Sequence, residues 1–465
     1  MHRTTLLAAL SAAFGLAAAP VLGLETYQLL IGASGHPQIE AVAALPAGNG
    51  DVYHVLSADL VSGGCSGPRC VVVMKVSDGP DPLQSVIVPV PFESVAAAAI
   101  DASGRVVIVG TAGNGGTGRD FRVVRLLPTL GNDPAFGAAG SGVRDIDFAA
   151  IGRTGRNDDV ATAVAISPLG EIVVVGQVDR TAPDDTDFGV ARLRASDGGL
   201  DVGFGQGVGL RAVHFDLAAN ARLDAPRAVA VDGAGRITVA GVATDGAAAS
   251  QRVAITRLLA TGGYDTTLCN DGCLFNNYPT IRNGRQVFYF GANNTHADEV
   301  AALALNGDGT RFVVAGHRDA NPEPNSQRKA YFAQFSAAGE LQREVGGYID
   351  TTNAANDAQY RGARFLPGSP DRLLLAGSFL GGSAHFVQRF GASGNAADPG
   401  FGSCGPASGV LCVGEAEVRV RALHIDGQGR GLVAFDTTHL GARVYRAYIV
   451  SLADGDRIFG NGFEP

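Results

Sequence analysis

Short apolar strands separated by glycine-rich turns recur along almost the whole chain. Residues 228–241 read AVAVDGAGRITVAG, which is an apolar strand, a turn and a second apolar strand that ends on Gly241. Runs of about four to eight residues that are enriched in Val and Ile and bounded by Gly are typical of β-strands. After the first 23 residues, no window that is longer than these strands keeps the 3.6-residue apolar period of an amphipathic helix. The pattern predicts an all-β protein.

This layout occurs seven times. Besides the copy at 228–241, copies end at Gly110, Gly176, Gly316 and Gly377, and two degenerate copies end at Leu56 and Phe435. Most units continue with a third alternating strand, such as FRVVRL, and three then have an Asp-x-x-Phe-Gly turn that begins at Asp133, Asp201 or Asp398. A fourth strand follows. The repeat therefore predicts units of four strands.

Four short antiparallel strands repeated seven times favour radial repetition. We expect a single β-propeller of seven blades, each with four antiparallel strands. An array of β-sandwiches is the competing architecture, but a sandwich needs about 100 residues. A linear β-solenoid is another, although its repeats are usually much shorter.

The two ends of the chain predict how the ring closes. The seventh unit ends its third strand near Leu452 and has little chain left for a fourth. Residues 24–31, LETYQLLI, form an apolar segment that precedes the first unit and belongs to none. We predict that this N-terminal strand lies in the last blade, so that no sheet edge is left open.

The units resemble the delta-60 repeat of secreted bacterial proteins. The resemblance rests on AVAVDGAGRITVAG, on the VxRL strand and on the DxxFG turn, and it covers roughly residues 38–453. It implies a β-propeller in an exported bacterial protein. It implies no established activity, and it supplies no catalytic residues.

The first residues predict export. Residues 1–23 have a short polar start, an apolar stretch and small residues near Gly23, which is typical of a secretory signal. A membrane anchor is the alternative, but the apolar run is shorter than the ~20 residues that a span needs. We therefore expect a signal peptide at 1–23, a β-propeller at 24–455 and a short C-terminal tail at 456–465, in a secreted or periplasmic protein.

The six cysteines fall into three pairs that are close in sequence: Cys65 and Cys70, Cys269 and Cys273, and Cys404 and Cys412. An even number of cysteines in an exported chain favours disulfides. Thiolate binding of a metal is the alternative, but the three spacings differ and no histidine lies close by. We expect three local disulfide bonds.

The charge and the aromatic residues limit the partners. A net charge of −9 argues against nucleic acid and against a polybasic contact with membranes. The chain has no tryptophan, a residue favoured at sugar sites and in protein interfaces. We expect a monomer with a protein or polysaccharide partner, which we would seek first at the irregular loops 61–70, 265–296 and 317–329.

One polar position precedes the first strand of six units. It is filled by Gln38, Glu93, Asp159, Asp224, Asp298 and Gln359. Repetition places these residues on a ring, and at a channel mouth their oxygen atoms would suit Ca²⁺. Glu93, Asp159, Asp224 and Asp298 are the candidate metal ligands.

The alternative is structural, and the sequence favours it. Each acid would then accept backbone N–H groups at a strand entry or pair with an arginine of a neighbouring blade. A basic position recurs as well, at Lys75, Arg125, Arg192, Arg257 and Arg389. An acid and a base that recur once per unit are what structural contacts between blades require.

Motifs for catalysis or cofactors are lacking. The letters G-x-G-x-x-G at 113–118 precede a strand, whereas the dinucleotide motif needs a helix there. G-x-S-x-G and H-E-x-x-H do not occur. We expect a binding or scaffold module with no cofactor other than Ca²⁺. The alternative is an extracellular hydrolase or lyase, metal-dependent or not, with its site at the channel mouth.

Overall fold

The computed structural model describes most of the repeat region. The described residues are 16–17, 26–31, 39–58, 68–77, 83–113, 115, 118–152, 158–180, 185–217, 222–244, 251–270, 283–290, 297–319, 328–346, 357–366, 372–380, 384–391, 397–398, 401, 403–404, 407–408, 410–414, 419–425, 431–439 and 442–450. Within them no helix is long and apolar enough to cross a membrane.

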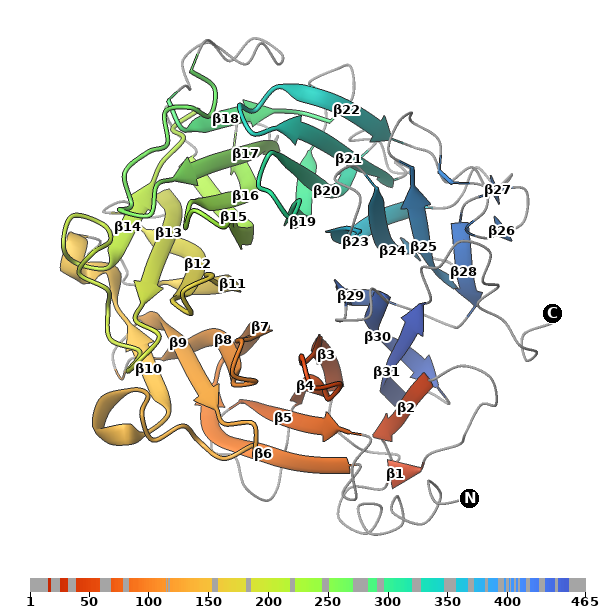
Figure 1. Cartoon of the computed structure of the whole chain (residues 1–465), viewed down its shortest axis with the longest axis horizontal. Helices are drawn as coiled ribbons and strands as arrows, with labels where there is room; N and C mark the ends of the chain where they lie inside the picture. The colour runs from red at the N-terminus through yellow and green to blue at the C-terminus, as the bar shows by residue number, and fades with distance from the viewer. Residues whose placement is uncertain are drawn as a thin grey trace.

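The strands form small antiparallel sheets around one axis (Figure 1). Four separate sheets have four strands each. The first has β3 (Ile39–Pro46), β4 (Val52–Ala58), β5 (Arg69–Val76) and β6 (Leu83–Phe92), and the second has β7 (Ser94–Ile100), β8 (Val106–Gly113), β9 (Arg119–Leu126) and β10 (Val143–Ile146). The third has β19 (Asp298–Leu305), β20 (Arg311–Asp319), β21 (Arg328–Ser336) and β22 (Leu341–Gly346), and the fourth has β23 (Asp357–Phe365), β24 (Leu373–Leu380), β25 (Ala384–Phe390) and β28 (Val410–Gly414).

Three further sheets differ in size. An eight-stranded sheet contains β11 (Val160–Ile166), β12 (Ile172–Asp179), β13 (Asp185–Leu193), β14 (Leu210–Val213), β15 (Arg222–Val231), β16 (Ile237–Thr244), β17 (Gln251–Leu258) and β18 (Arg285–Phe288). A five-stranded sheet contains β1 (Leu16–Ala17), β2 (Thr26–Ile31), β31 (Ala442–Val450), β30 (Gly431–His439) and β29 (Arg419–Ile425). The pair β26 (Ser403–Cys404) and β27 (Ala407–Ser408) and the 3₁₀ turns η1 (Ala138–Gly140) and η2 (Phe148–Ile151) complete the described elements.

The sheets form a closed ring. The first strands of successive units contact one another in the order β3, β7, β11, β15, β19, β23 and β29, and β29 contacts β3.

The predicted all-β propeller architecture is confirmed. The prediction of seven four-stranded blades is wrong, because only four described sheets are separate four-stranded blades. The reason is visible at β13 and β15, where a short parallel pairing of Asp185 and Thr186 with Arg222 and Leu223 merges two units into the eight-stranded sheet.

The prediction for the N-terminal strand is confirmed. β2 pairs antiparallel with β31, with Thr26 opposite Tyr448 and Leu29 opposite Tyr445. Figure 1 shows β2 beside β31, so the first and last strands of the propeller share one sheet. β1 lies inside the predicted signal segment. Cleavage after residue 23 would remove β1 and keep the pairing that joins the two ends of the ring.

The glycine that ends most repeats has a packing reason. Each first strand has a register shift shortly after its entry, for example between Ala161 and Ala163 in β11. The shift directs a backbone carbonyl at the partner strand, and a Cβ built on Gly176 would collide with the carbonyl oxygen of Val160 and with the ring of Phe121. In this unit the glycine leaves room for the carbonyl oxygen beside the β-bulge. The units that end at Leu56 and Phe435 have the same bulge without a glycine.

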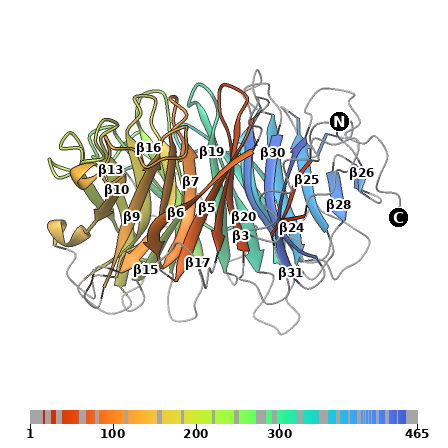
Figure 2. The same cartoon turned by 90° about the horizontal axis from the view of Figure 1, so that it is seen from below.

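The hydrophobic core lies between neighbouring sheets. One cluster joins Val175 and Phe188 of one unit to Ile237 and Val239 of the next. Seen from the side, the strands cross the ring from one face to the other (Figure 2). Val231, which ends the first strand of its unit, and Leu258, which ends the third, both lie beside Ile237. The turns after first and third strands therefore share one face, the turn face, and the first strands begin at the opposite face, the entry face.

Candidate functional site

The recurring acids at the strand entries do not form one open ring of ligands. Asp159, Asp224 and Asp298 are buried, whereas Glu93 is exposed. Gln359 is buried as well, and Gln38 lies outside the described residues.

Each buried acid accepts a backbone N–H from the end of the preceding unit. Asp159 accepts from Phe148 at 3.2 Å, Asp224 from Phe215 at 2.7 Å and Asp298 from Phe290 at 3.2 Å. All three phenylalanines follow the fourth strand of the unit before. The acid therefore fastens that strand to the next unit, which is the structural role that the sequence favoured.

Burial strongly shifts the ionisation of these acids. It raises the pKa of Asp159 to about 7 and that of Asp224 to about 8, although the backbone N–H groups oppose the shift. Burial also raises the pKa of Asp298 well above its ordinary value, against the nearby Arg252 and Arg318. Burial therefore favours the protonated form of Asp224 and Asp298 at neutral pH, although the hydrogen bonds from backbone N–H groups favour the ionised form.

The recurring basic residues pair with other acids than predicted. Arg125, Arg192 and Arg257 each bind the aspartate that opens the following turn in their own unit, with Nε to Oδ2 distances of 2.7, 2.8 and 2.7 Å to Asp133, Asp201 and Asp265. Arg389 pairs in the same way with Asp398, whereas Lys75 pairs with Asp51, which lies just before the second strand of its unit. Of the two structural alternatives for the acids at the strand entries, the structure therefore shows acceptance of backbone N–H groups and not pairing with these bases.

The same arginines connect one unit to the next. Arg125 donates from Nη1 to the carbonyl oxygen of Ala195 at 2.6 Å, and Arg257 donates likewise to Ala337 at 2.5 Å. The guanidinium of Arg125 also lies 4.4 Å from the ring centre of Phe136, the phenylalanine of the turn. The Asp-x-x-Phe-Gly turn is therefore a structural joint on the turn face.

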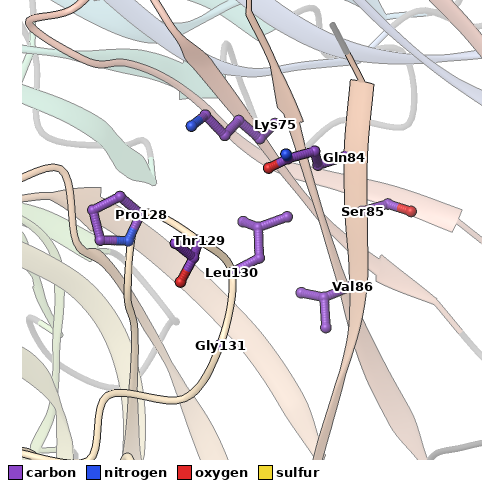
Figure 3. Close-up of a pocket in the computed structure, with 8 residues that line it drawn as sticks. All are labelled: Lys75, Gln84, Ser85, Val86, Pro128, Thr129, Leu130 and Gly131. Atoms are coloured by element: carbon purple, nitrogen blue, oxygen red, sulfur yellow. The ribbon is translucent and has the colours of Figure 1, made fainter. Parts of the chain in front are cut away.

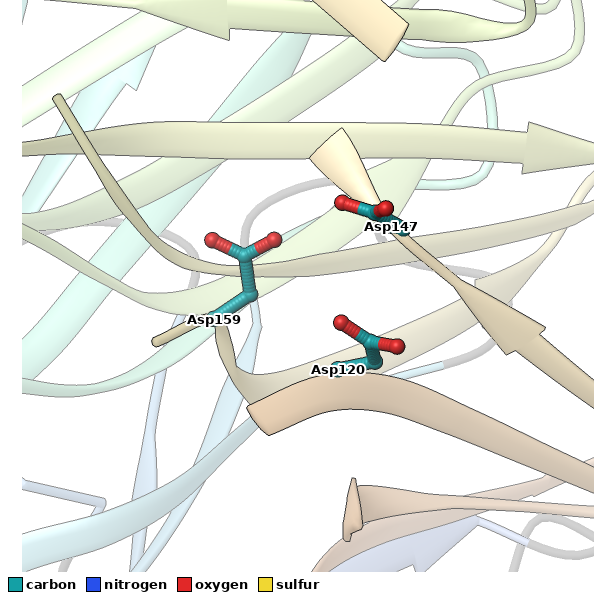
Figure 4. Close-up of side chains that lie close together, drawn as sticks. All are labelled: Asp120, Asp147 and Asp159. Atoms are coloured by element: carbon teal, nitrogen blue, oxygen red, sulfur yellow. The ribbon is translucent and has the colours of Figure 1, made fainter. Parts of the chain in front are cut away.

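Asp159 also belongs to a group of three carboxylates. Asp120 on β9, Asp147 after β10 and Asp159 each offer an oxygen atom, and these atoms lie within 4.8 Å of one another (Figure 4). Asp159 is buried, Asp120 half-buried and Asp147 exposed. Charged Asp120 and Asp147 add to the rise in the pKa of Asp159. Hard cations such as Ca²⁺ take oxygen ligands of this kind.

In the next two units, an arginine side chain lies at or beside the position that is equivalent to Asp120. Asp187 occupies in β13 the position of Asp120 in β9, and Arg180 lies 3.4 Å from it. In β17 the position is occupied by Arg252. Sequence reasoning missed Asp120 and Asp147, because they come from segments far apart in the chain.

A cavity of about 520 Å³ opens between two units on the outside of the ring (Figure 3). Lys75 and Ser85 line one side, and Thr129 and Leu130 line the other. The Lys75 ammonium is 2.8 Å from Asp51, so the charge that the cavity contains is already neutralised. The chemistry of these groups favours no particular ligand.

A second cavity, of about 370 Å³, lies beside apolar side chains of the turn face. Its lining residues are Ile151, Gly205, Gln206, Val208, Leu210, Arg211 and Ala212, and Val208 is 38% exposed. Val202 in the same loop is 68% exposed, and Leu259 of the neighbouring unit is 41% exposed. The two loops touch, because Gly205 donates its N–H to Thr261 at 3.1 Å.

The other predicted sites are only partly described. Most of the loops 61–70, 265–296 and 317–329 lies outside the described residues. Cys70 and Cys269 are buried, whereas Cys65 and Cys273 and the side chains of Cys404 and Cys412 lie outside them. The three disulfides stay a prediction.

The sequence comparison agrees with the ring. A profile described as a "Domain of unknown function (DUF5122) beta-propeller" matches residues 102–136, which include β8, β9 and Phe136. This segment is a propeller repeat. No curated protein matches the chain.

Solved structures support the same fold. An ulvan lyase of polysaccharide lyase family PL25, bound to -[GlcA(1-4)Rha3S]-, is 11% identical and has a TM-score of 0.52, with 90% of this propeller and 95% of that chain covered. A second structure of a PL25 ulvan lyase is 10% identical, with a TM-score of 0.51 and the same coverage. The polysaccharide lyase Uly1 is 11% identical over 94% of both chains, with a TM-score of 0.49. The likeness to the two PL25 structures, at these identities, concerns the fold alone.

Proposed function

We propose that the chain is an exported β-propeller of the delta-60 type that binds another protein through its turn face. The observation that carries this proposal is the apolar surface formed by Val202, Val208 and Leu259 beside a cavity. Exposed apolar side chains that gather on one face are typical of interaction sites. A rigid ring that presents loops is a suitable scaffold for such a site.

The charged residues support this proposal indirectly. The buried acids at the strand entries and the arginines of the turn joints hold the units together, as their contacts show. They are therefore parts of the framework. The side chains of Val202, Val208 and Leu259 are instead exposed to solvent on these loops.

Two variants test the binding surface. We expect Val202→Ser combined with Leu259→Ser to lose the species that the immobilised wild-type protein retains from culture medium. Leu223→Ser is the matched control, because Leu223 is 39% exposed but lies at the entry face. Retention of the same species by all three proteins would rule out this surface.

A second candidate is a hydrolase or lyase that acts on a polysaccharide. The group of Asp120, Asp147 and Asp159 favours it, because a carboxyl group with a pKa of about 7 is suited to proton transfer at neutral pH. Ca²⁺ held by the same oxygen atoms would supply charge stabilisation.

For this candidate we expect EDTA to lower the melting temperature at pH 8 and Ca²⁺ to restore it. Asp147→Asn should weaken the response, because Asp147 is an exposed member of the group and its loss leaves the buried hydrogen bonds of Asp159 intact. Asp197→Asn, on an exposed turn, is the control. A melting temperature that EDTA and Ca²⁺ leave unchanged would exclude a cation here, and sugar release from uronate polysaccharides would then be sought without metal.

A further inference from the structure

Two units carry basic side chains where the others carry small or apolar ones. The penultimate residue of each first strand is, in chain order, Leu45, Ala99, Ala165, Ala230, Ala304, Arg364 and His424. These positions are equivalent in register. Arg364 pairs with Leu374 and His424 with Leu432, just as Ala165 pairs with Val173, one step before the end of the hairpin. Arg364 and His424 therefore stand at the same level of the ring.

Arg364 and His424 lie close together on the inner wall. β23 and β29 are neighbours at the inner edge of the ring (Figure 1), and they approach so closely that a Cβ on Gly362 would meet the Cβ of Leu423 at 2.5 Å. Arg364 is near enough to His424 to disfavour its protonation.

Arg364 is a half-buried cation without a described counter-charge. Its Nη1 donates to the carbonyl oxygen of Ala363 at 2.7 Å, and among the described residues it makes no other hydrogen bond or ion pair. A guanidinium has five N–H donors, so most of them remain for a ligand. Burial lowers the pKa of Arg364 to about 10, and no described carboxylate opposes that shift. A partly desolvated charge without a counter-charge gains from a bound anion.

His424 supplies a second donor at this place. Burial, and then the charge of Arg364, lower the pKa of His424 to about 3, so the ring is neutral at pH 7. A neutral imidazole has one N–H donor and one acceptor nitrogen. The pair therefore offers a charged planar fork beside a single neutral donor.

We propose that Arg364 and His424 bind a small oxyanion on the inner wall of the ring. A guanidinium matches the spacing of two oxygen atoms of a carboxylate, sulfate or phosphate group, and it binds them with two parallel hydrogen bonds. The alanines at the equivalent level of four other units leave room for the group. This inference is independent of the binding surface proposed above, because it concerns the axis of the ring.

The test is thermal unfolding of the purified protein with sulfate, phosphate or acetate, each against sodium chloride of equal ionic strength. A ligand that binds only the native state raises its stability in proportion to ln(1 + [L]/Kd). We expect a saturable rise in the melting temperature for at least one oxyanion. The three arms distinguish a carboxylate ligand from sulfate and phosphate.

Two variants carry the decision. Arg364→Ala and His424→Ala introduce the residue that four of the other units have at this position. Each should weaken the affinity for the oxyanion at least tenfold, as judged from the concentration that gives half of the rise. Without oxyanion, Arg364→Ala should melt no lower than the wild type, because it removes a half-buried cation that has no described counter-charge. Arg227→Ala is the control, since Arg227 also lies on a first strand but is 2.9 Å from Glu299. Its response should equal that of the wild type.

An equal response in all four proteins would overturn the proposal, because sulfate also stabilises proteins without a site. The absence of a response in the wild type would overturn it as well. If Arg364→Ala fails to fold, NMR spectroscopy of the wild-type protein tests the proposal. The imidazole resonances of His424 should then shift saturably with the oxyanion, since a neighbouring anion favours the imidazolium. Resonances that do not move would exclude the site.

Discussion

Replacement of Arg125 by leucine should lower the free energy of unfolding by about 3 to 5 kcal/mol, the usual cost of breaking a buried ion pair from one side. Arg125 and Asp133 are both buried and 2.7 Å apart. Leucine keeps apolar volume over Phe136, so the loss would come from the charge left on Asp133 and from the carbonyl oxygen of Ala195. Arg105, which lies 3.7 Å from Asp133, would still neutralise part of the charge of Asp133.

Chemical denaturation of both proteins under the same conditions measures this loss. The control is Arg194→Leu, because Arg194 pairs with Asp197 at 2.6 Å in the same region but both side chains are largely exposed. Exposed pairs contribute little, since water and salt screen them. We expect a much smaller change for the control. Equal losses in the two variants would show that Arg125 acts as an ordinary surface residue and would contradict the joint described above.

The order of strands could be predicted from the sequence because the residue pattern within each unit is enough to predict the strands of that unit. Alternating apolar residues and the turn before Arg236 predict the hairpin of β15 and β16, which the structure has. Residues 24–31 were predicted to complete the last sheet because they fit no unit. The number of strands in each sheet was not predictable in this way. The parallel pairing of Asp185 with Arg222 depends on how far one strand extends beside another, and no local pattern specifies that.

The pairing of charges shows the same limit. The sequence displays two recurring acids and one recurring base per unit, but the shape of the joint selects the partner. A signal was nevertheless present, because Asp133 follows Arg125 by eight residues and Asp201 follows Arg192 by nine. Arg364 and His424 also had a signal, since they stand where the other units have alanine or leucine. The group around Asp159 had none, because its members come from three segments that only the fold brings together.

The wild-type protein should lose stability as the pH rises from 5 to 8, and Asp224 should account for much of the loss. Burial raises the pKa of Asp224 from 3.8 to about 8, so the folded protein holds a proton that the unfolded chain releases above pH 4. The stability gained from this proton is complete below the ordinary pKa and is lost as the pH approaches the raised one. One pKa unit corresponds to about 1.4 kcal/mol, so the loss should be on the order of several kcal/mol.

Asp224→Asn isolates this contribution, because an amide oxygen can still accept the N–H of Phe215 but cannot ionise. Denaturation at pH 5, 6, 7 and 8 should give a clearly shallower decline for the variant than for the wild type. Asp197→Asn is the control: Arg194 lowers the pKa of Asp197 to about 2, so that group affects stability only as the pH falls below 4. Its decline between pH 5 and 8 should equal that of the wild type. Parallel curves for all three proteins would mean that Asp224 ionises in the fold without cost, and the acid would then need a cation beside it in solution.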